Sequence, residues 1–422
     1  MSYVRKGLVV LLIGAFCATA CGRSDSDSRP ATGTAIGAGP ATGTVTVWAQ
    51  GAEAEQLPGL LKQFTAENPD VHVKVTPIPW DAAHNKYQTA IAGGTTPDIG
   101  QLGTTWMGEF GASDALAPVP ANLNPGAFYS GAVKSTQLRG GTYGIPWYVD
   151  TPVLYYRTDL AAKAGHPGPP ATWADFKALA KAMQTKAGAK YGVSLGAKDF
   201  QGFLPFAWSN GASLTSADGT RWTLDGPAMV EAVRYYQSFF TEGIADRSPS
   251  NDPGAHEAAF VNGSVPMFIG GPFEAAELTK AGGAGFTAKY ATAVLPRAKS
   301  ATSFVGGSNL VVFKKSANPG AAWKLIQFLS RPKTQVGWYR TTGDLPSVQA
   351  AWTDPALSND PKLAVFGQQL KDVSAPPATV EWTQVQAAGD AQMERVMVAG
   401  EDPAKAMAAL QSTAVSIGTG VR

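Results

Sequence analysis

Residues 144–159 read GIPWYVDTPVLYYRTD, and this stretch carries most of the fold prediction. A glycine and a proline lead into a compact aromatic group, and Asp150 stands two residues after Tyr148. An apolar run typical of a β-strand follows. A carboxyl group between an aromatic wall and a buried strand needs hydrogen-bond donors, because burial of an unpaired acid is unfavourable. We therefore expect a partner that donates hydrogen bonds to Asp150.

The length and composition of the chain indicate a globular protein with more than one core. A chain of 422 residues exceeds what one hydrophobic core usually covers, so we expect two lobes or domains. The hydrophobic fraction is 44% and the mean hydropathy is −0.07. The formal net charge is only +2, which argues against nucleic acid as a partner.

Residues 1–20 are predicted to be a lipoprotein signal peptide. Arg5 and Lys6 precede an apolar run that is too short to span a bilayer. The sequence ATACG at 18–22 resembles a bacterial lipobox, which implies lipidation of Cys21. Ordinary cleavage that leaves Cys21 as an incidental thiol is the alternative. Cleavage before Cys21 would leave no other cysteine, which excludes a disulfide within the mature chain and a thiolate metal site.

The next segments predict a flexible tether and then an α/β lobe. Residues 21–43 are almost devoid of apolar side chains, so we expect them to form the tether. The following pattern of strand, helix, strand, helix and strand predicts a parallel sheet covered by helices. Its members are expected at residues 44–49, 53–68, 71–78, 86–94 and 97–102. Later helices are expected at 172–184, 227–240, 319–329 and from 383 onward, and later strands at 265–269, 291–295 and 309–313.

Seven segments, in a fixed order behind the lipobox, resemble the extracytoplasmic solute-binding proteins of carbohydrate ABC importers of the maltose-binding type. Together they extend to within about 70 residues of the carboxyl end, and Trp382 extends the match further. They are TVTVWA with the helix ending FTAENPDVHVKV, AIAGGTTPDIGQLGTTWMGEF, GIPWYVDTPVLYYRTDL, PPATWADFKALA, AAFVNGSVPMFIGGPFEAA, FVGGSNLVVFKKSANPGAAWKLIQFLSRPKTQ and GDLPSVQAAW.

The resemblance implies the α/β, two-lobed periplasmic-binding-protein type II fold. Each lobe is expected to be a mixed, mostly parallel sheet flanked by helices, with the ligand cleft between the lobes. The expected N-terminal lobe is 44–150 plus 297–343, and the expected C-terminal lobe is 151–296 plus 344–422. The crossing segments near residue 150, residue 296 and residue 343 are expected to act as hinges.

The resemblance also implies the partners. They are a mono- or oligosaccharide, the permease subunits of an ABC transporter, and a cell membrane contacted through the lipid anchor. The protein is expected to be an extracytoplasmic monomer without a cofactor or catalytic activity. A metal site is not expected, because the four histidines are scattered and no HExxH motif occurs. Two alternatives remain open: a secreted glycoside-acting enzyme, because carboxylates are plentiful, and a receptor of the same fold for a non-sugar solute.

Sugar sites combine hydrogen-bonding groups with aromatic walls, because sugars present both hydroxyl groups and apolar C–H patches. The resemblance implies that Asp150 accepts hydrogen bonds from sugar hydroxyls and that Phe273 stacks on the ring. It implies supporting roles for Tyr148, Trp382, Trp106, Thr105, Glu53 and Gly307. For each residue a structural role is the alternative: a hinge cap at Asp150, core packing for the aromatic rings, and a strained strand entry at Gly307.

Overall fold

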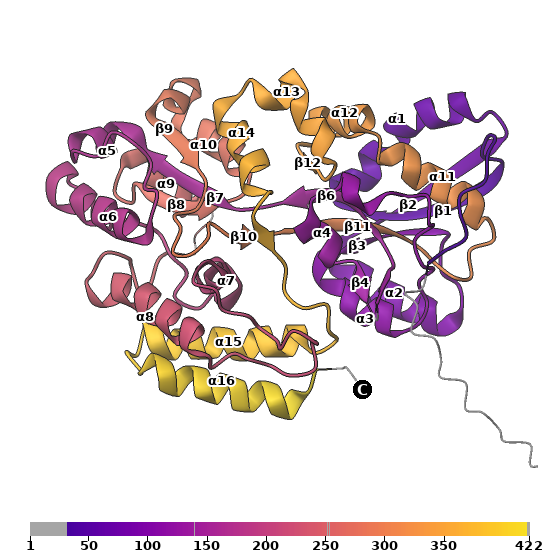
Figure 1. The fold of residues 1–422 in the computed structure, drawn as a ribbon. Helices are drawn as coiled ribbons and strands as arrows, with labels where there is room; N and C mark the ends of the chain where they lie inside the picture. Colours follow the sequence, from indigo (N-terminus) through magenta and orange to yellow (C-terminus); the bar gives the residue numbers. More distant parts are fainter. Residues whose placement is uncertain (1–31, 139, 251, 253, 420–422) are drawn as a thin grey trace, which may run out of the picture.

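The computed structural model describes residues 32–138, 140–250, 252 and 254–419. The predicted signal peptide, residues 1–20, and the predicted lipid site, Cys21, lie outside the described residues. Two α/β lobes lie side by side, and strands run from one lobe into the other (Figure 1). The arrangement matches the predicted two-lobed α/β class.

The N-terminal lobe is built on a six-stranded sheet of order β12-β6-β11-β3-β1-β2. β1 pairs in parallel with β2 and with β3, whereas β11 runs antiparallel to β3 and to β6, and β12 runs antiparallel to β6. The parallel part of this sheet is formed by the segment for which alternating strands and helices were predicted. Its strands are β1 (Gly43–Gln50), β2 (Val71–Ile78) and β3 (Ile99–Gly103), with β6 (Ile145–Asp150), β11 (Gly306–Val312) and β12 (Leu345–Pro346) completing the sheet.

The C-terminal lobe contains a three-stranded sheet of order β8-β7-β9, in which both pairs are antiparallel. The prediction of mostly parallel sheets is therefore wrong for this lobe. The chain leaves the six-stranded sheet along β6 and returns along β11, so the strands on the outgoing and returning chain run in opposite directions. The three strands are β7 (Val153–Arg157), β8 (Met267–Gly270) and β9 (Tyr290–Ala293).

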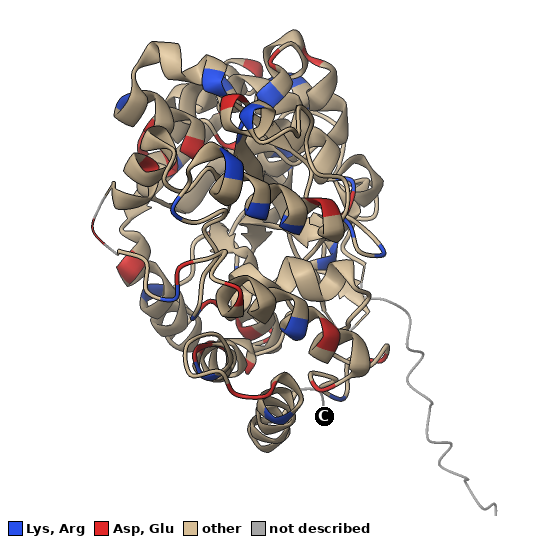
Figure 2. Cartoon of the chain, turned by 90° about the vertical axis from the view of Figure 1, so that its left-hand side faces the viewer, with Lys and Arg blue, Asp and Glu red and all other residues tan. Residues whose placement is uncertain are grey.

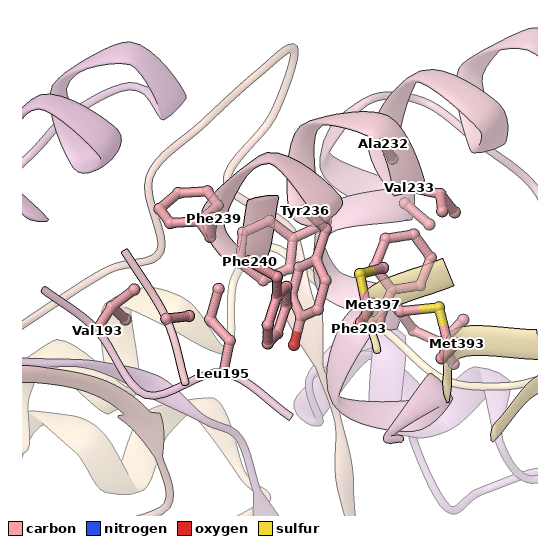
Figure 3. Packing of buried hydrophobic residues seen from close by; sticks show 14 of the residues in the cluster. Val193, Leu195, Phe203, Ala232, Val233, Tyr236, Phe239, Phe240, Met393 and Met397 are labelled. Atoms are coloured by element: carbon pink, nitrogen blue, oxygen red, sulfur yellow. The ribbon is translucent and has the colours of Figure 1, made fainter. Parts of the chain in front are cut away.

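The largest core of the C-terminal lobe lies among α7 (Phe200–Ser209), α8 (Pro227–Thr241) and α15 (Trp382–Met397). Figure 3 shows Tyr236 of α8 near Phe203 of α7, with the two methionines of α15, Met393 and Met397, beside Phe203. Apolar residues recur along α8 every three or four positions, which places them on one face of the helix. Burial of that face attaches α15 to this lobe.

Further helices cover both lobes (Figure 1). They are α1 (Gly51–Glu67), α2 (Trp80–Gly93), α3 (Met107–Ala112), α4 (Ser130–Lys134), α5 (Thr158–Lys163), α6 (Trp173–Ala187), α9 (Ala255–Asn262), α10 (Glu274–Gly282), α11 (Pro319–Leu329), α12 (Pro332–Thr342), α13 (Pro355–Ser358), α14 (Pro361–Gln369) and α16 (Pro403–Ile417). Short 3-10 turns are η1 (Thr104–Trp106), η2 (Pro125–Ala127), η3 (Ala284–Lys289) and η4 (Gln349–Thr353). Two-residue strands are β4 (Gln137–Leu138), β5 (Gly141–Thr142), β10 (Ser303–Phe304) and β13 (Val373–Ser374).

The positions at which the chain crosses between lobes differ in part from the predicted boundaries. The first crossing, between β6 and β7, lies where it was expected. Arg297 still forms a bridge with Thr172 of the C-terminal lobe, and the chain re-enters the six-stranded sheet only at Gly306. The boundary predicted at residue 344 precedes β12, which pairs with β6 and so belongs to the N-terminal sheet.

The predicted flexible tether, residues 21–43, is wrong in its second half, because residues 32–43 lie against the N-terminal lobe. The backbone N–H of Gly33 donates to the carbonyl of Val119 at 2.9 Å, and Ala41 is buried. This hydrogen bond and the burial of Ala41 hold in place a segment that has almost no apolar side chains of its own. Composition alone cannot reveal such docking, because the partners come from distant parts of the chain.

Charges of both signs are distributed over the molecule. Figure 2 shows Lys and Arg interspersed with Asp and Glu across the face in view. This mixture agrees with the small formal net charge of +2. Among the described residues, no helix has both the length and the apolar character needed to cross a membrane.

Candidate functional site

Six of the site residues predicted from the sequence lie along one edge of the six-stranded sheet. The carboxyl ends of β1 and β3, the end of β6 and the starts of β11 and β12 meet along this edge. Ligands of open α/β sheets bind beyond the carboxyl ends of the strands. Glu53, Thr105, Trp106, Tyr148, Asp150 and Gly307 all lie on or directly after these strand ends.

A hydrogen-bond network at this edge fixes Tyr148 and Glu53. The Tyr148 hydroxyl donates to Oε1 of Glu53 at 2.6 Å and accepts from the Ser308 hydroxyl at 3.0 Å. The Gln101 amide donates to the Ser308 hydroxyl at 3.2 Å. Glu53 stands in the first turn of α1, where the helix dipole favours a carboxylate. The network joins β6, β11, β3 and α1 into one rigid polar wall.

Asp150 and Phe273 come from different lobes and meet at Gly271. A Cβ atom added to Gly271 would lie 3.1 Å from Oδ1 of Asp150 and 2.9 Å from the ring of Phe273. Phe273 is 60% exposed, which is unusual for a large apolar side chain. Oδ1 of Asp150 is buried, and no described residue donates a hydrogen bond to it. An unpartnered acid therefore lies beside an open aromatic face.

Burial raises the pKa of Asp150 to about 6, although the backbone N–H of Thr151 opposes the shift. The physical cause is the loss of solvation of the carboxylate, because the group receives little hydrogen bonding in return. Glu274, directly after Phe273, shows the same condition: burial raises its pKa to about 7, and its Oε2 has no partner among the described residues. Hydrogen-bond donors of a ligand would stabilise such a group.

Asp344 belongs to the same group, and sequence reasoning missed it. It precedes β12 and accepts a hydrogen bond from the Trp338 indole N–H at 3.0 Å. Burial, and next the charge of Glu53, raise the pKa of Asp344 to about 7. The available signal was its position in the GDLP loop at the third crossing, which was predicted to be a hinge.

Gly307 occupies a position that tolerates no side chain. Its φ angle is 108°, and an added Cβ would lie 2.3 Å from the carbonyl oxygen of Tyr148. The Thr104 hydroxyl donates to the Gly307 carbonyl at 2.9 Å. Glycine adopts this backbone conformation freely because it has no Cβ. The residue thus lets β11 pass close to β6 at the edge of the sheet.

Thr105 and Trp106 lie in the turn after β3. Thr105 is exposed, and Trp106 is half-buried. The ring of Trp106 packs edge-on against Trp80, at 5.7 Å between ring centroids, and against His84 at 5.4 Å. Trp80 is itself exposed to 39% and extends this aromatic wall. Trp106 therefore packs against its aromatic neighbours and is also partly exposed.

Trp382 lies apart from this group. It is 1% exposed and packs among Phe200 and Trp222, with centroid distances of 6.4 and 6.5 Å. The structure therefore contradicts its prediction as a stacking residue, because no ring face is open to a ligand. The reason is the burial of the first turn of α15 in the helical core of the C-terminal lobe.

A cavity of about 820 Å³ lies against the sheet edge, and its lining includes Tyr148, Asp150, Phe273 and Asp344. Its size falls within the range of small-molecule sites in proteins. The remaining walls come from α10, β9, α12 and α14, so both lobes contribute. Within the described part of the chain, no group of three or more His, Cys, Asp or Glu side chains is placed to hold a metal ion.

Known proteins share this architecture. A family model of bacterial extracellular solute-binding proteins matches residues 48–336. A putative binding protein of Brucella abortus is 28% identical over 335 residues, which cover 77% of this chain and 80% of the relative. The sugar-binding protein MalE from the phytopathogen Xanthomonas citri has a TM-score of 0.84 and 33% identity, with 89% of this chain and 97% of that chain covered. The GacH receptor of Streptomyces glaucescens GLA.O has a TM-score of 0.74 and 26% identity, with 90% and 100% covered.

The family model spans well over half of the chain, and this protein therefore belongs to the bacterial extracellular solute-binding proteins. The prediction of that class and the prediction of a periplasmic-binding-protein fold are both confirmed. Membership also identifies the chain as a binding component of a transport system and not as an enzyme. The alternative of a glycoside-acting enzyme is removed.

Proposed function

We propose that this protein captures a mono- or oligosaccharide between its lobes and delivers it to the permease of an ABC transporter. One observation carries the choice of a sugar: the buried, unpartnered Oδ1 of Asp150 lies beside the exposed ring of Phe273. An anionic acceptor next to an open aromatic face suits a molecule with hydroxyl donors and apolar C–H patches. The relative from Xanthomonas citri is a sugar-binding protein, which supports the same choice.

Three parts of the site have separate tasks in this proposal. Asp150 accepts from a sugar hydroxyl, and one hydrogen bond to a charged group contributes about 1.5–3 kcal/mol. Phe273 stacks on the apolar face of a sugar ring. Tyr148 and Glu53 hold the opposite polar wall, while Gly307 brings the backbone close. Thr105 and Trp106 lie at the same edge of the sheet, outside the lining of the cavity.

Capture by closure follows from the contribution of both lobes. Asp150 ends a strand of the N-terminal sheet, and Phe273 follows a strand of the C-terminal sheet. A ligand that contacts both lobes binds the closed arrangement more tightly and shifts the population toward it. The crossing between β6 and β7 serves as a hinge in this proposal, and the protein works as a monomer.

We also propose that Cys21 carries a lipid that holds the protein at the outer face of the cytoplasmic membrane. Metabolic labelling with a tritiated fatty acid tests the anchor. We expect the native chain to be labelled and the Cys21→Ser variant to be unlabelled. Label in both proteins would place the lipid elsewhere.

Titration of the purified protein with a sugar panel tests the function. We expect saturable heat in isothermal titration calorimetry with at least one sugar, together with a rise in the unfolding temperature. Recovery of the same sugar intact by chromatography is the companion control. If no sugar binds and an amino acid, peptide or polyamine does, the protein is a receptor for a non-sugar solute.

A further inference from the structure

Two carboxyl groups, Asp150 and Asp344, line the cavity of the proposed site from neighbouring segments of the chain. β12 and β6 are antiparallel, with Leu345 opposite Val149 and Pro346 opposite Tyr148. One residue further along, this register places Asp344 opposite Asp150. Residues directly opposite in such a pair have Cβ atoms about 4.5–5.5 Å apart and point to the same face, and like charges at these positions are destabilising.

A third carboxyl group joins this pair from α1. Tyr148 and Asp150 are two residues apart on β6 and therefore lie on one face of the strand. On that face the Tyr148 hydroxyl donates to Glu53, and the Glu53 charge reaches Asp344. Asp344 thus experiences the charges of both Glu53 and Asp150, and Oδ1 of Asp150 has no partner among the described residues.

In the described part of the chain these acids form no ion pair. None of its ion pairs includes Glu53, Asp150 or Asp344. The described lining of the cavity contains the acids Asp150, Glu277, Asp344 and Asp360 and a basic residue, Lys362. The ammonium group of Lys362 lies 5.1 Å from the ring centroid of Tyr290, on β9 of the C-terminal lobe.

A neutral sugar explains only part of this arrangement. Its hydroxyls need acceptors, and a carboxylate is a stronger acceptor than an amide, but neighbouring carboxylates repel one another, whereas Asn or Gln side chains would not. Two carboxylates in one cavity, with the charge of Glu53 acting on one of them, favour a bound positive charge, because a cation stabilises their ionised forms. Burial raises the pKa of both Asp150 and Asp344, and for Asp344 the charges of Glu53 and Asp150 raise the pKa further.

We propose that the preferred ligand is an amino sugar, whose protonated nitrogen lies between Asp150 and Asp344. This inference rests on the proposed sugar-binding function and narrows its substrate class. The ring of Phe273 then stacks on the sugar, while the acids hold the ammonium group. Sugar acids and sugar phosphates are excluded by the same charges.

Matched sugars test the inference. Calorimetric titrations use the hydroxyl, 2-amino, 2-acetamido and uronic acid forms on each of three scaffolds: glucose, cellobiose and trehalose. The pH is kept below the pKa of the sugar amine. We expect the amino form of the bound scaffold to bind at least about tenfold more tightly than its hydroxyl parent. The acetamido form should lose this advantage, because acetylation removes the charge, and the uronic acid form should bind more weakly than the parent.

Two variants test whether Asp344 causes the preference for the amino form. Asp344→Asn preserves the shape of the side chain and should reduce the amino preference to about threefold or less while the hydroxyl parent still binds. Asp225→Asn, which removes an exposed carboxylate before α8, should keep the full preference. Circular dichroism and unfolding temperatures establish that both variants fold.

The outcomes separate the two proposals. A hydroxyl parent that binds as tightly as its amino form overturns the amino-sugar inference and leaves the sugar-binding function intact. An amino preference that survives in Asp344→Asn also overturns it. Absence of binding by every sugar on all three scaffolds, with binding of an unrelated solute, overturns the sugar-binding function and the inference with it.

Discussion

The loop after β8 and the first turn of α15 carry the same sequence prediction, an aromatic wall for the ligand, but the fold uses them differently. Phe273 stands in the loop with 60% of its surface exposed, next to Asp150. Trp382 begins α15 with 1% exposed and packs on Phe200. The comparison shows that the resemblance predicts an aromatic residue at a position but does not predict whether that residue is exposed. The tertiary packing decides whether that ring is a wall or a part of the core.

The largest expected effect is on stability, and it separates the two rings. Trp382→Ala should lower the free energy of unfolding by about 3–5 kcal/mol, because it removes a buried ring and leaves a cavity. Phe273→Ala should leave the unfolding transition within about 0.5 kcal/mol of wild type, since little buried surface is lost. Chemical denaturation followed by Trp fluorescence and circular dichroism measures both. Equal destabilisation by the two substitutions would break the comparison.

A second effect tests the backbone between the lobes. Gly307→Ala should destabilise the fold by about 1–3 kcal/mol, because alanine is strained at a φ of 108° and its Cβ would meet the Tyr148 carbonyl. Gly306→Ala is the matched control, since its Cβ would approach only a ring edge of Phe304, at 3.0 Å. Thermal denaturation compares the neighbours. An unaffected Gly307→Ala protein would contradict the role assigned to this close approach.

The third prediction concerns affinity. Asp150→Ala should weaken sugar binding at least tenfold, or about 1.4 kcal/mol, with little change in the unfolding temperature. Phe273→Ala should weaken binding through loss of the stacked ring, whereas Phe273→Trp should retain it. Calorimetric titration with the best sugar of the panel provides the measurement. Full affinity in Asp150→Ala would remove this residue from the site.

The comparison also explains what the sequence could predict. Periodicity and turn residues located the main elements, and α11 begins and ends where it was predicted, because Pro319 and a following apolar face mark it clearly. The resemblance supplied the two-lobed fold. The family order of segments also predicted that Asp150 and Phe273 belong to one binding site.

Long-range placement accounts for the rest. Asp344 was missed because its neighbour, Asp150, lies far away in the sequence and becomes adjacent only through the β12–β6 pairing. The docking of residues 32–43 and the burial of Trp382 depend likewise on distant partners. The antiparallel pairing of β7 with β8 and with β9 is likewise a long-range feature, which local alternation does not record.

The smallest expected effect is a pH dependence of stability that reports on Asp344. In the folded protein burial, followed by the charge of Glu53, raises its pKa from 3.8 to about 7. Between these values the folded form holds a proton that the unfolded chain has released, so this group's contribution to stability falls as the pH rises from about 4 to 7. The slope is at most about 1.4 kcal/mol per pH unit, and solvent in the cavity reduces it.

Asp344→Asn isolates this contribution, because Asp150 and Glu274 have pKa values raised in the same direction and remain in both proteins. The stability of wild type relative to Asp344→Asn should therefore decrease between about pH 5 and pH 7.5 in ligand-free protein. Thermal unfolding of the two proteins across this range gives the difference. A relative stability that rises with pH would mean that a cation of the protein already compensates Asp344. The space beside Asp344 would then need no positive charge from a ligand, which would leave the exposed ring of Phe273, rather than the acids, as the main ligand contact.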